Sequence, residues 1–270
     1  MSKLRGLALS KMQLLSLPQS VHLLSNLQTL CLDQCVLGDI SIIGNLEKLE
    51  NLSLVDSDIE WLPNEIGELT QLRLLDLSSC WNLKVIPPNV ISKLTQLEEL
   101  YMGNTFVKWE FEGKEGGAEA SATFVFPKVI FLKLWNLSEL RTFYSGLHTS
   151  EWPLLKRLEV YGCDKVKIFT SGFFGFRNSV VRQLTIPTQQ PLFLVEKVIS
   201  NLEELKLGGK DITMICQDHL PKHLFQNLKS LEVVSDKSDN FSIGSLQRFH
   251  NMEKLELRQF IQRDIFKWRG

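Results

Sequence analysis

Apolar residues recur along this chain in short segments that share one spacing. Leucine or another apolar residue occupies the first, fourth and sixth positions of each segment, as Leu27, Leu30 and Leu32 do. Eleven segments keep this spacing: residues 4–9, 27–32, 49–54, 72–77, 97–102, 129–134, 155–160, 181–186, 202–207, 228–233 and 252–257. Most of them begin 21 to 26 residues after the previous one. Such an interval indicates a chain built from repeated structural units.

An interval of this length, with one short apolar strand in each unit, is typical of the leucine-rich repeat. One unit cannot bury its apolar edge alone, so neighbouring units must stack. The sequence therefore predicts an α/β leucine-rich-repeat solenoid, a curved horseshoe with a concave parallel β-sheet. Its convex side should carry irregular, 3₁₀ or short helical returns, because prolines such as Pro18 and Pro63 mark them. The pair Pro87-Pro88 predicts no regular helix before Val90.

The regular spacing is interrupted once. Between the segments that begin at residues 97 and 129 the interval rises to 32 residues, and residues 112–122 are small, charged and poor in apolar side chains. Such a composition is typical of a flexible linker or loop. We expect an N-terminal repeat arm at residues 1–111, a flexible insertion at 112–124 and an irregular C-terminal repeat arm at 125–270. The alternative is an insertion that bulges from an unbroken horseshoe.

Charge and hydropathy narrow the range of partners. The chain has a formal net charge of −1, and its Lys and Arg residues form no cluster along one predicted element, which argues against a nucleic-acid partner. The first residues enter the first repeat without an apolar signal segment, and no run approaches the roughly 20 apolar residues that cross a bilayer. We therefore expect a cytoplasmic protein without membrane insertion. The sequence leaves its oligomeric state open.

Three of the five cysteines share one position in the repeat. Cys35, Cys80 and Cys163 each come three residues after the last apolar residue of their segment, where the chain turns out of the strand. A small buried side chain fits this bend, so we expect the three to be structural. Because they belong to different coils, the sequence predicts no disulfide between them.

No pattern of chemically reactive residues points to catalysis. Cys216, His219 and His223 have a spacing that resembles part of a zinc site, but no fourth ligand lies near them in the sequence. No Ser or Cys has the surroundings of a nucleophile, and the acidic residues are interspersed with Lys and Arg as on a solvated face. We therefore predict a protein that is not an enzyme and has no cofactor or metal site.

Several stretches carry residues that repeat packing alone does not require. Residues 97–104 read Leu-Glu-Glu-Leu-Tyr-Met-Gly-Asn and continue to Trp109-Glu110, and residues 148–156 contain the run Glu151-Trp152-Pro153. With residues 30–35, they resemble the repeat region of plant intracellular disease-resistance proteins of the coiled-coil, nucleotide-binding, leucine-rich-repeat class. The resemblance covers nearly the whole chain.

The resemblance implies a role in plant innate immunity, but only for the repeat region. Complete members of this class resemble switch ATPases with a Gly-x-x-x-x-Gly-Lys phosphate loop, and this chain contains no such loop. We therefore expect neither ATP binding by these residues nor an N-terminal coiled coil among them. We expect a fragment, a truncated product or a free repeat protein.

Residues that alternate with the inward apolar positions should face the concave surface, where repeat solenoids usually bind partners. The first arm presents mainly small or polar residues there. Across the insertion the face becomes aromatic and charged, with residue types that are frequent at binding hot spots. The predicted protein-binding residues are Glu99, Tyr101, Phe131, Lys133, Trp135, Arg157, Glu159 and Tyr161. They form one patch if the sheet continues past the insertion.

Two functions remain compatible with the sequence. The first is a non-catalytic recognition module of an immune receptor, which binds a pathogen effector or a guarded host protein, or restrains the receptor's nucleotide-binding domain. The alternative is a generic leucine-rich-repeat scaffold, or a degenerate receptor fragment, without an immune role. A phosphate loop encoded upstream in the same reading frame would favour the first.

Overall fold

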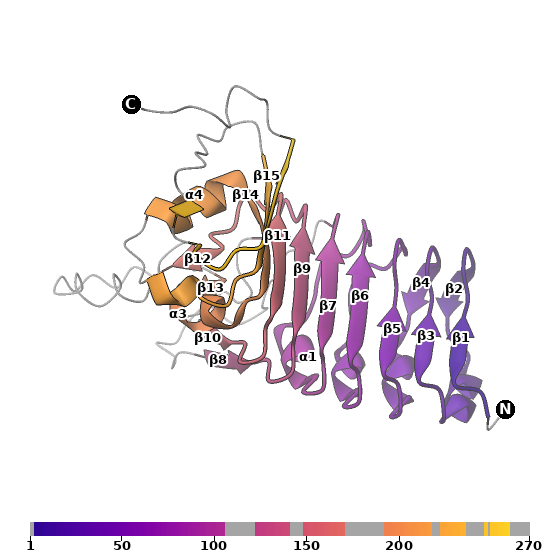
Figure 1. Ribbon diagram of the computed structural model, residues 1–270. Coiled ribbons are helices and arrows are strands. Elements are labelled where there is room, and N and C mark those ends of the chain that lie inside the picture. Colours follow the sequence, from indigo (N-terminus) through magenta and orange to yellow (C-terminus); the bar gives the residue numbers. More distant parts are fainter. Residues whose placement is uncertain are drawn as a thin grey trace, which may run out of the picture.

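The computed structural model describes residues 3–105, 122–140, 148–170, 192–217, 222–235, 246–247 and 249–259. This part of the chain forms an elongated solenoid around one parallel sheet of ten strands (Figure 1). In sheet order the strands are β1 (Gly6–Ala8), β3 (Thr29–Cys31), β5 (Asn51–Ser53), β6 (Leu74–Ser78), β7 (Glu99–Gly103), β9 (Phe131–Trp135), β11 (Arg157–Tyr161), β14 (Glu204–Gly208), β15 (Ser230–Val234) and β16 (Lys254–Arg258). The predicted leucine-rich-repeat solenoid is confirmed.

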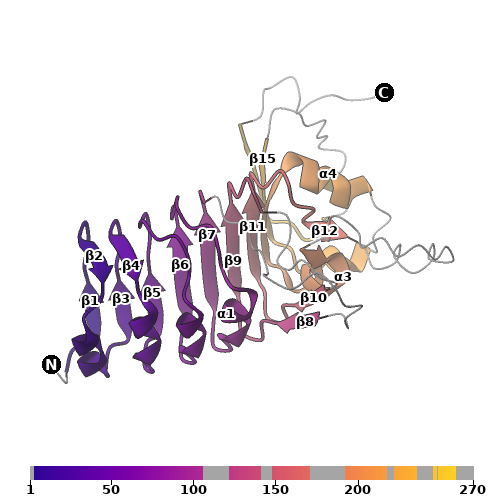
Figure 2. The same cartoon turned by 180° about the vertical axis from the view of Figure 1, so that it is seen from behind.

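The remaining elements form the returns between these strands, seen from behind in Figure 2. Three short parallel pairs are β2 (Gln13–Ser16) with β4 (Val36–Asp39), β8 (Ala122–Val125) with β10 (His148–Glu151), and β12 (Phe169–Thr170) with β13 (Phe193–Leu194). The 3₁₀ helices are η1 (Gln19–Leu24), η2 (Ser41–Asn45), η3 (Asn64–Glu68), η4 (Ile199–Asn201) and η5 (Lys222–Phe225). The α-helices are α1 (Pro88–Lys93), α3 (Val195–Val198) and α4 (Gly209–Gln217).

The middle leucine of each repeat sets the register of the main sheet. Leu52 pairs with Leu30 on one side and with Leu75 on the other, and the same alignment continues from strand to strand. These side chains point into the solenoid, and from Leu30 to Leu231 none is more than 3% exposed. Burial of apolar area on this scale is the main favourable contribution to folding. The sequence segment at 181–186 lies outside the described residues, and β11 pairs directly with β14.

The sheet continues across the interruption in the repeat spacing. Strand β7 pairs with β9 along five residues, from Glu99 opposite Phe131 to Gly103 opposite Trp135. This pairing fits the alternative in which the insertion bulges from an unbroken horseshoe. Residues 112–121 of the predicted insertion lie outside the described residues. Residues 122–124 of the predicted insertion belong to β8, which pairs with β10 in parallel.

Three of the described returns have a short helix directly at a proline. Helix η1 follows Pro18 and η3 follows Pro63, and both are 3₁₀ helices, as the sequence predicts. The expectation at Pro87-Pro88 is wrong, because α1 is an α-helix that begins at Pro88. A proline at the first helical position is compatible with a helix, since its missing N–H would have no partner within the helix.

The three repeat-position cysteines are buried at the turns, as predicted. The Sγ of Cys80 lies 3.0 Å from the carbonyl oxygen of Leu54, and that of Cys35 lies 3.5 Å from the carbonyl oxygen of Leu9, each in the preceding coil. All five cysteines are free thiols. Burial raises the pKa of the Cys80 and Cys163 thiols to about 12. These two thiols therefore stay protonated at neutral pH and act as packing groups.

Substitution of one middle leucine tests the role of the stacked core. Leu75→Ala should lower the free energy of unfolding by about 2–5 kcal/mol, because the fully buried side chain leaves a cavity between β5 and β7. The same change at Leu15, which is 70% exposed, is the matched control and should cost less than about 0.5 kcal/mol. Urea unfolding measures both. Equal losses would contradict a core centred on the sheet leucines.

Candidate protein-binding face

All eight predicted binding residues lie together on the concave face of three adjacent strands. In one row across the strands, Glu99 pairs with Phe131, and Phe131 pairs with Arg157. In the next row Tyr101, Lys133 and Glu159 are neighbours in the same way. Trp135 and Tyr161 form a third row. We refer to these eight residues as the aromatic patch.

The aromatic rings of the patch contact one another and the neighbouring cations. The rings of Tyr101 and Phe131 meet edge to face, with centroids 5.0 Å apart. The guanidinium carbon of Arg157 lies 4.4 Å from the centre of the Phe131 ring, and Lys133 Nζ lies 4.9 Å from that of Trp135. Cation–π contacts of this kind stabilise the positions of both partners.

Trp135 depends on the absence of a side chain at Gly103 of the next strand. A Cβ atom added at Gly103 would lie 2.0 Å from the indole Cδ2. The indole therefore lies over the glycine backbone and covers part of β7. Any larger residue at Gly103 would push the indole out of this position.

Glu159 connects the charged residues of the patch. Its side chain is 8% exposed, and one oxygen lies 3.3 Å from Lys133 Nζ. The other accepts a hydrogen bond from Arg157 Nε at 3.0 Å and a second from the same guanidinium. Burial alone would raise the pKa of Glu159, but the hydrogen bond from Arg157 and the charges of Lys133 and Arg157 together hold it below its usual value. The carboxylate is therefore ionised at neutral pH and orients both cations.

The concave face continues beyond the patch onto β14, β15 and β16, whose residues are not among the predicted binding residues. Lys206 on β14 lies 4.5 Å from the centre of the Tyr161 ring and 2.8 Å from a carboxylate oxygen of Glu232 on β15. The same oxygen lies 2.7 Å from Arg258 Nε on β16. These residues occupy the same repeat positions as the patch residues, so the repeat register in the sequence could have identified them.

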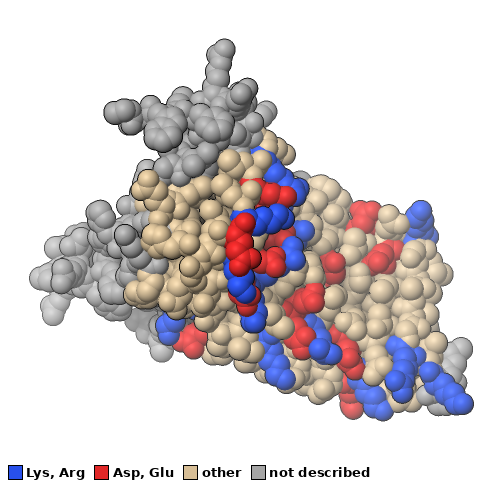
Figure 3. All heavy atoms as spheres, in the orientation of Figure 1, with Lys and Arg blue, Asp and Glu red and all other residues tan. Residues whose placement is uncertain are grey.

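The charged side chains of this region form one band. Figure 3 shows Lys and Arg mixed with Asp and Glu over the C-terminal strands of the sheet. Alternating neighbours such as Lys133 and Glu159, or Lys206 and Glu232, neutralise one another. The band is therefore polar but close to neutral.

The N-terminal half of the concave face differs in size and in charge. Its positions are mainly small or polar residues, and its charged ones are acidic: Asp33, Asp76 and Glu99. Asp76 accepts hydrogen bonds from the amide and the hydroxyl of Ser78. Burial, with a contribution from the charge of Asp33, nevertheless raises the pKa of Asp76. This half of the face is therefore a low, acidic floor next to the aromatic patch.

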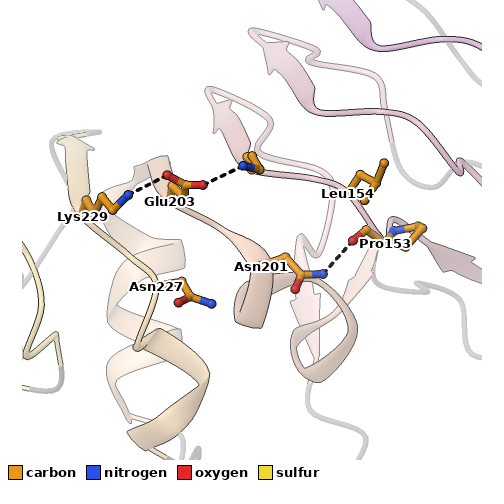
Figure 4. A pocket seen from close by; sticks show the side chains of 7 residues that line it. Pro153, Leu154, Asn201, Glu203, Asn227 and Lys229 are labelled. Atoms are coloured by element: carbon orange, nitrogen blue, oxygen red, sulfur yellow. Dashed lines mark hydrogen bonds and ion pairs between the residues drawn. The ribbon is translucent and has the colours of Figure 1, made fainter.

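A shallow pocket of about 370 Å³ lies at the edge of the sheet, where the chain enters β11, β14 and β15. Glu203 lies between the ammonium groups of Lys229 and Lys156, at 2.9 and 3.0 Å. Figure 4 shows the contact of Glu203 with Lys229. Asn201 donates to the carbonyl of Pro153, and Asn227 to that of Ser200. The polar groups of the pocket thus bond to the protein itself, and their contacts join successive repeats.

The described ranges contain neither a cluster of metal-binding residues nor a membrane-crossing helix. No group of three or more His, Cys, Asp or Glu is placed there to hold a metal ion. Cys216 lies in α4 and His223 in η5, whereas His219 is outside these ranges. No described helix has the length and apolar content that a membrane-crossing segment needs.

Removal of the Glu159 charge tests the network. Glu159→Gln should lower the free energy of unfolding at neutral pH by about 1 kcal/mol, a small value because Arg157 is 46% exposed and solvent screens the pair. The folded-state pKa of Glu159 is lowered, so its stabilisation is present above the unfolded pKa and is lost as pH falls through the folded pKa. The difference between parent and variant should therefore shrink below about pH 4.5. Urea titrations at several pH values measure it, and a constant difference would argue against the network.

A known relative agrees with the resemblance in the sequence. A disease resistance protein of Arabidopsis thaliana is 32% identical over 276 aligned residues, which cover 95% of this chain and 27% of that protein. The mouse platelet glycoprotein Ib alpha chain is 39% identical over 80 residues, 30% of this chain and 11% of that protein. No protein-family model matches the chain.

Solved structures with a similar backbone include further leucine-rich-repeat proteins. One from Leptospira interrogans is 19% identical, with a TM-score of 0.44 over 95% of this chain and 67% of that one. The ectodomain of the receptor kinase SOBIR1 from Arabidopsis thaliana is 20% identical, with a TM-score of 0.34 over 58% of this chain and 71% of that one. The chain spans about 27% of the length of the disease resistance relative. By its repeat, its parallel sheet and this relative, the chain is a leucine-rich-repeat solenoid that resembles plant disease resistance proteins.

Proposed function

We propose that this chain is the non-catalytic recognition module of an intracellular plant immune receptor, and that the aromatic patch binds a protein. The observation that carries the proposal is the joining of β7 to β9, which places the eight patch residues on one uninterrupted surface. Tyr, Trp and Arg are the residue types that contribute most to binding at protein interfaces. Here they occur together on the solvent-facing side of a rigid sheet.

The contacts within the patch favour binding without rearrangement. Phe131 touches both Tyr101 and Arg157, while Glu159 joins Arg157 to Lys133. Side chains that are already ordered lose less conformational entropy when a partner covers them. The patch therefore offers large aromatic area at a low entropic cost.

Two kinds of partner suit an immune receptor. One is an external protein, either a pathogen effector or a guarded host protein. The other is the nucleotide-binding domain of the same receptor, which the repeat region would restrain until an effector binds. Either partner requires coupling between two sites, in which binding at one changes the affinity at the other. The similarity to a disease resistance protein over 95% of the chain supports this class of function.

A generic scaffold without an immune role is the alternative. Part of this chain also matches the mouse platelet glycoprotein Ib alpha chain, so similarity to these repeats is not confined to disease resistance proteins. The alternative predicts that partner binding, if any, does not involve a nucleotide-binding domain. A phosphate loop in the upstream reading frame would argue against it.

Removal of two aromatic rings tests the patch. Trp135→Ala with Tyr161→Ala should weaken capture of the nucleotide-binding domain of a full-length disease resistance relative at least tenfold, about 1.4 kcal/mol, because both aromatic rings of the third row of the patch are lost. Purified chain and domain are compared by pull-down and by titration. Circular dichroism checks that the variant folds.

The matched control removes two other exposed rings. Trp61 and Trp81 are 49% and 53% exposed and lie outside the concave strands, so their replacement by Ala should leave capture unchanged. Equal capture by the parent and by the Trp135/Tyr161 variant would contradict the proposal for the patch. No capture by the parent would point to an external protein as the partner, or to a degenerate fragment that has lost its role.

A further inference from the structure

The two halves of the concave face differ in how their charges are compensated. From β9 to β16, the described acidic residues have cationic neighbours on the same face, such as Lys133 beside Glu159 and Arg258 beside Glu232. On β1, β3, β5, β6 and β7 the concave positions contain no Lys or Arg. Figure 3 shows acidic atoms in the middle of the N-terminal half, with Lys and Arg atoms at its upper corner and along its lower edge.

The three carboxylates of the N-terminal half are held by neutral donors. Asp33 accepts hydrogen bonds from the Ser53 hydroxyl at 2.6 Å and from the Val55 amide at 3.0 Å. Glu99 accepts one from the hydroxyl of Tyr101. Among the described residues, Asp33, Asp76 and Glu99 form no ion pair within 4 Å, whereas the nearby Glu50 and Glu98 pair with Arg73. No ion pair therefore compensates their charge, although Lys133, which pairs with Glu159, lies near enough to offset part of the rise in the pKa of Asp76 that burial causes.

The carboxylate of Asp76 is accessible because the side chains around it on β3 and β5 are short. Cys31, Ser53 and Asp76 are neighbours across β3, β5 and β6, and their short side chains form a low floor. Tyr101 is the next residue in the same row and is much larger. Neighbouring strands are about 4.8 Å apart, so the Tyr101 side chain stands directly beside the Asp76 carboxylate.

We propose that the concave face binds its protein partner through a basic segment laid over β3, β5 and β6, with a Lys or Arg side chain against Tyr101 and its charge near Asp76 and Asp33. Charge complementarity sets the sign of the partner, because the carboxylates without an ion pair lie in this half. The long stem of a Lys or Arg can cover an aromatic ring while its charged end reaches a carboxylate. The inference rests on the proposed protein-binding role of the face and names the chemistry of the partner.

A set of three labelled peptides tests this assignment. They alternate serine with lysine, with glutamate or with glutamine, and fluorescence anisotropy measures their binding to the full chain. The lysine peptide should bind more tightly than the other two. Tighter binding of the glutamate peptide, or no difference among the three, would overturn the proposal.

Charge-removing variants locate the binding. Asp33→Asn with Asp76→Asn should weaken binding of the lysine peptide about tenfold, because two carboxylates that face it are lost. Glu60→Gln with Glu68→Gln changes the net charge equally on the returns, where both groups pair with lysines, and should change binding less than about twofold. Equal losses in the two double variants would overturn the proposal.

A single substitution provides a second test in case the Asp33/Asp76 double variant misfolds. Glu99→Gln removes a carboxylate that is bonded by one hydroxyl, and it should weaken binding in the same direction by a smaller factor. If the peptides show no charge preference while the Trp135/Tyr161 variant still loses capture of its protein partner, the basic assignment fails and the protein-binding role remains. If that capture is unaffected while the lysine peptide binds as described, the role of the aromatic patch fails instead.

Discussion

The stacking of parallel strands in register, with one buried leucine at the centre of each, is the constraint on which the structure depends. Each coil covers the apolar edge of the next, so the order of the sheet follows from the order of the repeats. Because side chains alternate between the two faces of a strand, the same leucines also fix which residues face the concave surface. The aromatic patch is therefore a consequence of the core register.

The core could be predicted from the sequence because its signal repeats. The concave residues followed from the same register, and all eight lie where the spacing places them. Local exceptions were harder to predict. The α-helix at Pro88 and the strand at residues 122–124 depend on the backbone of single returns, and β8 pairs with β10 across more than 20 residues without a periodic signal. The position of the Trp135 indole over Gly103 was not predicted, because it depends on which strands are neighbours in the sheet.

The concave face has one half with paired charges and one acidic half, although the net charge of the chain is small. Paired charges from β9 to β16 orient one another and leave the aromatic area accessible, whereas the acidic residues around Asp76 have neutral hydrogen-bond donors. A formal net charge of −1 conceals this division, because it sums over both faces and both halves. The distribution of charge along the sheet therefore says more about a partner than the total does.

The continuity of the sheet across the insertion can be measured most directly by amide hydrogen exchange with mass spectrometry. The account predicts that β7 and β9 exchange as slowly as β6 and β11, because their amides bond across the interruption, as Asn104 does to the carbonyl of Trp135 at 3.0 Å. Fast exchange confined to β7 and β9, between slowly exchanging neighbours, would contradict it. The eight patch residues would then not share one surface.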